Sequence, residues 1–127
     1  MNSSKKNQMG LLYLVHLLIS ADGVIDEKEF TSLLRLKNRE NIPDSVFKEF
    51  EDGIKDKKEK EIYRTGIDLI SECTDQQKID VFANLYNLSE VDGAVHIKEV
   101  RLLLYSIKAA GGIEFNDVVD RAKKQVK

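Results

Sequence analysis

Residues 20–30 read Ser-Ala-Asp-Gly-Val-Ile-Asp-Glu-Lys-Glu-Phe, an Asp-Gly turn between an apolar segment and an amphipathic one. A weaker copy lies 70 residues further on, where Asp92-Gly93-Ala94-Val95 takes the place of Asp22-Gly23-Val24-Ile25. Each copy has an apolar helix pattern before the turn and a second helix pattern after it. The repeat predicts two related helical hairpins, residues 11–38 and 81–108, that pack about a pseudo-twofold axis.

The chemistry of each turn explains why one helix ends there and another begins. Gly23 and Gly93 stand where a helix ends, and glycine adopts the left-handed backbone conformation that such an end needs. Asp26 is a good N-cap for the next helix, with Glu29 at the third helical position of a capping-box-like pair. His96 replaces the acid in the second copy and is a poorer cap.

Two hypotheses compete for the acidic side chains of these turns. The first is capping and helix-dipole compensation, because acids are favourable in a first helical turn. The second is a weak, composite site for calcium, magnesium or manganese, which oxygen ligands suit better than zinc. Neither turn is a complete EF-hand, since Leu18 and Ser20 stand at the first and third ligand positions of the first copy. The candidate ligands therefore come from both copies: Asp22, Asp26, Glu29, Glu90, Asp92 and Glu99.

The two turns resemble the tellurite-resistance TerB-like family, whose pattern is an Ala-Asp-Gly turn, an apolar residue and a downstream Glu, twice in an all-helical domain. Residues 20–30 carry the motif, and in the weaker copy Val91 replaces the Ala and His96 the acid. The resemblance implies a cytoplasmic, non-enzymatic protein of tellurite and other stress responses, with divalent-cation binding in some members. Related modules are attached to J domains, but this chain lacks their His-Pro-Asp tripeptide and resembles an isolated module.

The rest of the chain is also patterned as helix, and no segment alternates with period two for long enough to indicate a sheet. The first two helices are expected at about 6–21 and 26–37, and a third follows Pro43 after a polar loop at 38–42. A fourth follows the charged run 55–61, the Thr74–Gln77 capping box opens a fifth, a sixth spans about 96–111, and a seventh starts near Asn116. We predict an all-α fold of about seven helices, one domain over residues 1–127 with residues 1–7 flexible.

The spacing of apolar residues predicts which side of each helix faces the core. The expected inward residues are Phe30, Leu33 and Leu34; Val46, Phe47, Phe50 and Ile54; Tyr63, Ile67 and Ile70; Ile79, Phe82, Ala83 and Tyr86; and Val118, Val119 and Ala122.

Composition argues against several classes of function. The 127 residues include 20 Lys+Arg and 22 Asp+Glu, and this near-neutral balance does not favour a nucleic-acid binder. The single Cys73 excludes an intrachain disulfide and a cysteine-based zinc cluster. The apolar run 9–21 contains His16 and is too short to span a bilayer, so we interpret it as a core helix and expect a cytoplasmic protein.

Few other residues carry a chemical signal. We interpret His16 as a core or boundary histidine and Cys73 as a structural thiol. Asp26 and Glu29 would be the acid and base of a small helical hydrolase, but no substrate pocket can be read from the sequence. The basic last helix is explained by dipole compensation, with a weak contact to an anionic membrane or nucleic acid as the alternative; its lysines are Lys123, Lys124 and Lys127.

The function expected from these patterns is that of a non-catalytic module. It acts in stress handling through partner proteins and responds to a weakly bound divalent cation. The alternative is a purely structural interaction domain without ion binding, in which the Asp-Gly turns only cap helices and a helix face binds the partner.

Overall fold

The computed structural model describes residues 5–19, 27–89, 98, 100, 103 and 113–125. Regular structure in these residues is helical and none of them lies in a strand, which confirms the all-α prediction. Residues 98, 100 and 103 of the predicted sixth helix are helical too. The helices with described bounds are α1 (Lys5–Ile19), α2 (Glu27–Arg39), α3 (Asp44–Ile54), α4 (Glu59–Ser71), α5 (Asp75–Asn87) and α7 (Phe115–Gln125).

Both Asp-Gly turns, 22–25 and 92–95, lie outside the described residues. The superposition of two related hairpins therefore stays a prediction. Residues 5–7, expected to be flexible, belong to α1, and Asn7 is buried.

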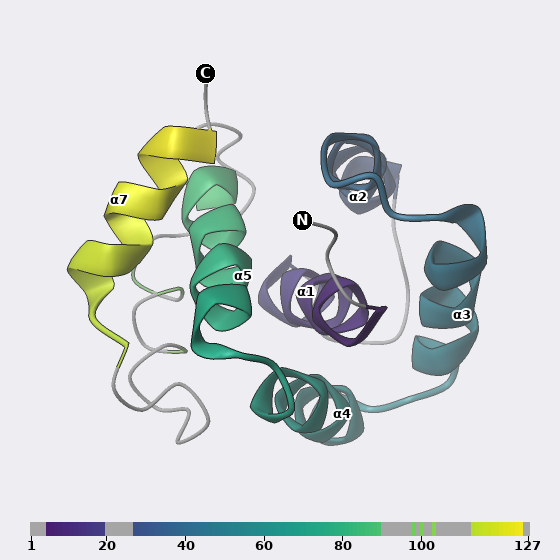
Figure 1. The fold of residues 1–127 in the computed structure, drawn as a ribbon. Helices are drawn as coiled ribbons and strands as arrows, with labels where there is room; N and C mark the ends of the chain where they lie inside the picture. Colours follow the sequence, from purple (N-terminus) through teal and green to yellow (C-terminus); the bar gives the residue numbers. More distant parts are fainter. Residues whose placement is uncertain are drawn as a thin grey trace.

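Helix α1 lies at the centre of the molecule (Figure 1). It packs most extensively on α4 and also contacts α2, α3 and α5, while α7 packs against α5. Every residue of α1 from Asn7 to His16 is buried. Because α1 is surrounded in this way, its sequence lacks the polar face of a surface helix.

Two glycines allow α1 and α4 to approach each other closely. A Cβ atom on Gly10 would lie 2.7 Å from Cδ1 of Ile70, and one on Gly66 would lie 3.3 Å from Cβ of Tyr13. Neither position has room for a side chain unless its neighbours move. The inner face of α4 is therefore the row formed by Ile62, Gly66 and Ile70.

This inner face differs from the predicted one. Tyr63 was expected in the core, yet it is 38% exposed, and Ile67 is half-buried. The close approach at Gly66 turns the neighbouring row of α4 toward α1 and leaves Tyr63 at the edge of the contact.

Helix α2 also presents a different face from the predicted one. Its buried residues are Glu29, Leu33 and Leu36, whereas Phe30 is 40% exposed and Leu34 37% exposed. Neighbouring residues of a helix are about 100° apart around its axis, so the buried face is rotated by about one residue. The contact responsible joins Glu29 to His16 of α1.

Other predicted features of the helices are confirmed. Thr74 is the N-cap of α5: its hydroxyl accepts from the Gln77 N–H at 3.1 Å, and the Gln77 side chain accepts from the Thr74 N–H at 2.9 Å. The predicted inward residues of α3 are all buried: Val46, Phe47, Phe50 and Ile54.

The segment 38–42, predicted to be a polar loop, instead contains the last residues of α2 and the turn that terminates the helix. The helix continues to Arg39, and Ile42 is buried. Asn41 has a φ of 54°, a left-handed conformation that asparagine tolerates, and the Ile42 N–H donates to the Lys37 carbonyl at 2.9 Å.

Polar side chains join α5 to its neighbours. The buried Asn87 donates to the Ala122 carbonyl of α7 at 3.2 Å, and Arg121 of α7 pairs with Asp80 of α5. One turn from Asp80 along α5, Asn84 accepts a hydrogen bond from Arg39 of α2 at 2.5 Å. These contacts join α5 to both α2 and α7.

Candidate functional site

The six predicted cation ligands are mostly beyond what the structure describes. Asp22, Asp26, Glu90, Asp92 and Glu99 lie outside the described residues. Only Glu29 is described, and it lies in α2 with its side chain fully buried.

Glu29 pairs with His16 of α1. The Glu29 carboxylate and Nδ1 of His16 share a hydrogen bond, and neither side chain has any exposed surface. The ring of Phe50 from α3 stands edge-to-face to the imidazole, with centroids 6.2 Å apart. His16 is therefore a core histidine, as interpreted from the sequence, and its partner is an acid 13 residues away.

This burial changes what Glu29 can do. A general acid or base must reach a substrate within hydrogen-bond distance, and a carboxylate with no exposed surface in a packed core does not. The structure thus weighs against an Asp26–Glu29 acid–base pair. Of the six carboxylates in the cation hypothesis, five lie outside the described residues. The sixth, that of Glu29, is hydrogen-bonded to His16.

Within residues 5–19, 27–89 and the shorter described segments, no group of three His, Cys, Asp or Glu side chains is placed to hold a metal ion.

Cys73 is buried, its thiol donates to the Leu69 carbonyl at 3.4 Å, and burial raises the pKa of this thiol above its usual value. A thiol held protonated in this way is a structural group rather than a nucleophile.

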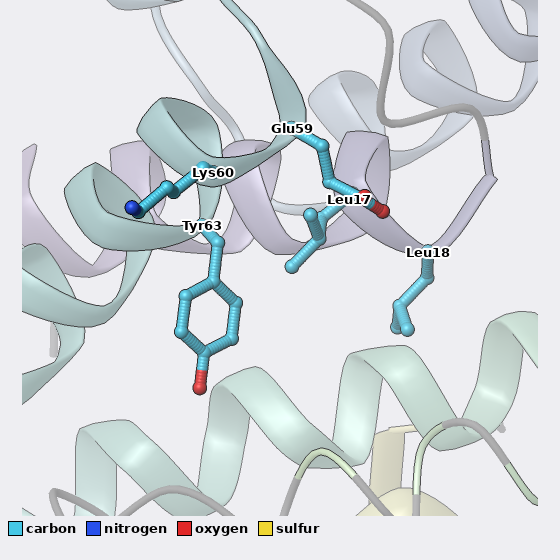
Figure 2. A pocket seen from close by; sticks show the side chains of 5 residues that line it. All are labelled: Leu17, Leu18, Glu59, Lys60 and Tyr63. Atoms are coloured by element: carbon cyan, nitrogen blue, oxygen red, sulfur yellow. The ribbon is translucent and has the colours of Figure 1, made fainter.

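An accessible groove lies beside α4. It consists of two adjoining hollows of about 420 Å³ each, which share Lys60 and Tyr63. Leu17, Leu18 and Glu59 complete the first hollow (Figure 2). The second is completed by Arg64, Ile67 and Asp68. We call the two hollows together the Tyr63 groove.

The floor of the Tyr63 groove is apolar. Figure 2 shows the side chains of Leu17, Leu18 and Tyr63 pointing to the same side, with the tyrosine hydroxyl at the outer end. Leu17, Leu18 and Ile67 are half-buried, and Tyr63 is one of three large apolar or aromatic side chains that are exposed in the described part of the chain. A tyrosine in this position offers an apolar ring and a hydrogen-bonding tip to an incoming molecule.

The rim of the groove is charged. Lys60 and Arg64 lie one helical turn apart, both exposed, and the structure gives neither of them an ion pair or a side-chain hydrogen bond among the residues it describes. The other arginines of the described part, Arg35, Arg39 and Arg121, each interact with another residue. Arg64 is thus the described arginine for which the described residues supply no ion pair or side-chain hydrogen bond.

Sequence reasoning did not find this groove. Tyr63 was read as a core residue because it fits the apolar spacing of α4. The sequence signal that would have indicated an exposed Tyr63 is its position between Lys60 and Arg64, with Gly66 on the next turn.

The basic residues of the last helix lie where the dipole hypothesis needs them. Lys123 and Lys124 are exposed in the last turn of α7, where cations stabilise the helix dipole. Among the described residues, no helix is long and apolar enough to cross a membrane.

No family model, curated protein or solved structure matches this chain at a significant level. The resemblance to the TerB-like family therefore rests on the two Asp-Gly turns and their flanking residues alone.

Proposed function

We propose that this chain is a non-catalytic helical module that acts by binding another protein, which docks in the Tyr63 groove. The observation that carries this proposal is the groove itself: an exposed tyrosine over a half-buried apolar floor, beside two cations to which the described residues supply no ion pair. Aromatic and arginine side chains are the residues that most often dominate the binding energy of protein interfaces.

The proposal keeps the interaction part of the TerB-like expectation. Stress handling through partner proteins needs a docking surface, and the groove supplies one on α1 and α4. The cation-binding part stays a prediction of its own, because the purely interaction-based alternative needs no ion.

Tyr63→Ser tests the proposal. Tagged wild-type chain and the variant are isolated from cells that make the protein naturally, and the proteins that copurify are quantified by mass spectrometry. We expect at least one protein that is enriched with the wild type and lost from the Tyr63→Ser variant. The side chain is 38% exposed, so its truncation should leave the fold intact, which circular dichroism would verify.

Phe30→Ser is the matched control. Phe30 is an aromatic residue of similar exposure, at 40%, but it lies on α2 and lines neither hollow of the groove. The partner should copurify with this variant as with the wild type. Identical sets of proteins with all three chains would contradict the proposed function.

A further inference from the structure

The shape of the Tyr63 groove indicates what kind of partner segment it accepts. Its α4 lining comes from three consecutive helical turns, at positions 59/60, 63/64 and 67/68. The nine steps from residue 59 to residue 68, at 1.5 Å rise each, correspond to a length of about 14 Å along α4. An open groove of this length along a helix suits a second helix of two to three turns that packs along α4 and meets Leu17 and Leu18 of α1 at one end.

The apolar floor is spaced for such a helix. Leu17 and Leu18 stand at one end, Tyr63 in the middle and Ile67 toward the other end. An amphipathic helix presents apolar residues at i, i+3 or i+4, and i+7 on one face, which matches three contact points along the groove.

The charges on the rim have a defined order. Lys60 and Arg64 are adjacent on one row of α4, while the acids Glu59 and Asp68 stand at the two ends. Lys60 in the first of the three turns and Arg64 in the second therefore form a pair of cations one turn apart, with Glu59 beside Lys60 and Asp68 one turn beyond Arg64. A complementary helix has two carboxylates one turn apart, since residues four apart lie on the same face.

We infer that the occupant of the Tyr63 groove is an amphipathic helix of a partner protein with two acidic residues, one turn apart, opposite Lys60 and Arg64. This inference rests on the proposed function and names the partner's chemistry. The acids at both ends disfavour a continuous anionic surface such as a lipid bilayer or a nucleic-acid backbone, because these would also be repelled by Glu59 and Asp68.

The test uses two synthetic, end-capped, fluorescently labelled helical peptides. Both have leucines at i, i+4 and i+7 on one face; one carries two glutamates a turn apart beside them, and the other carries lysines at those positions. Fluorescence anisotropy measures their binding to the full chain. Wild-type protein should bind the glutamate peptide more tightly by roughly 3- to 30-fold, as two exposed ion pairs would give.

Charge exchange makes the test specific. Lys60→Glu/Arg64→Glu should reverse the preference, so that this variant binds the lysine peptide more tightly. Lys123→Glu/Lys124→Glu on α7 changes the net charge by the same amount away from the groove and should leave the wild-type preference unchanged. A preference that shifts equally in both double variants would reflect net charge only and would overturn the inference.

Three further outcomes separate this inference from the proposed function. If a natural partner depends on Tyr63 but neither peptide is preferred, the inference fails and the proposed function stands. If wild-type chain binds phosphatidylserine vesicles more tightly than the glutamate peptide, the occupant is not an acidic helix and the inference is overturned. If no partner depends on Tyr63, the proposed function itself fails.

Discussion

The buried pair His16 and Glu29 determines how α2 packs on α1. Two ionisable side chains are removed from water completely and are stabilised there through their mutual hydrogen bond, at the contact between α1 and α2. Removing one member of such a pair leaves the other buried without its partner, which costs much more than replacing both by apolar groups.

Single and double replacements of this pair should therefore not be additive. We expect His16→Leu and Glu29→Leu each to lower the free energy of unfolding by about 3–5 kcal/mol, and the double variant to lose clearly less than the sum. Urea unfolding followed by circular dichroism measures the three differences. The exposed pair Lys5–Glu49, with its atoms 2.8 Å apart, is the control, and its double-leucine variant should change stability by less than about 1 kcal/mol. Costs that simply add at His16 and Glu29 would show that the two side chains are not coupled.

The same pair shows what the sequence could not predict about single residues. Glu29 was expected in a turn that caps a helix or binds a cation, since an acid in the first turn of a helix is usually exposed. Its partner lies on another helix, and no periodicity links the two positions. Lys60 and Arg64 were likewise unremarkable in the sequence, because only the packing of α1 on α4 places a groove between them and Leu17 and Leu18.

Among whole elements, the contact between α1 and α4 depends on glycine. A methyl group on Gly10 meets the end of the Ile70 side chain at 2.7 Å, in a core where Ile70 has no exposed surface. An alanine there gains about 1 kcal/mol of helix propensity but overpacks the contact, which costs about 1–3 kcal/mol. The overpacking should win, because the methyl has no free space.

Gly10→Ala is expected to lower the free energy of unfolding by about 1 kcal/mol, and Ile70→Val should relieve part of this loss. Valine lacks the Cδ1 atom that the new methyl meets. Ile70→Val alone costs about 0.5–1.5 kcal/mol, and the double variant should cost less than the two single costs together. Thermal unfolding of the four proteins measures this. A double variant as unstable as the sum, or worse, would show that Gly10 and Ile70 are not the limiting contact.

The elements differ in how well they could be predicted. The all-α class, the core face of α3 and the Thr74 cap followed from local sequence, because each depends on residues within about a turn of one another. The faces of α2 and α4 were predicted wrongly at Phe30, Leu34 and Tyr63 because the decisive contacts are tertiary. A glycine on the inner face of α4 and a buried carboxylate on α2 both contradict the rule that apolar side chains mark the core.

For the molecule as a whole, the cation hypothesis now rests on five carboxylates, since Glu29 serves the core. Weak binding of calcium, magnesium or manganese across the two turns stays our prediction, with millimolar affinity because no single turn completes a coordination shell. NMR titration should show shifts around Gly23 and Gly93 that disappear in Asp22→Asn/Asp92→Asn. Glu29→Gln should leave these shifts in place. Shifts that are absent at millimolar ion, or unchanged in the double variant, would leave only helix capping for these acids.

The central position of α1 has a consequence for how the chain matures. Of the six bounded helices, the ribosome makes this one first, yet its neighbours α4 and α5 are made only as residues 59–87 emerge. During that interval only α2 and α3 can cover α1, and the side that packs on α4 and α5 stays exposed, a condition in which nascent chains aggregate or recruit chaperones. Helix α1 is thus synthesised early, but it can be completely buried only after more than half of the chain has been translated.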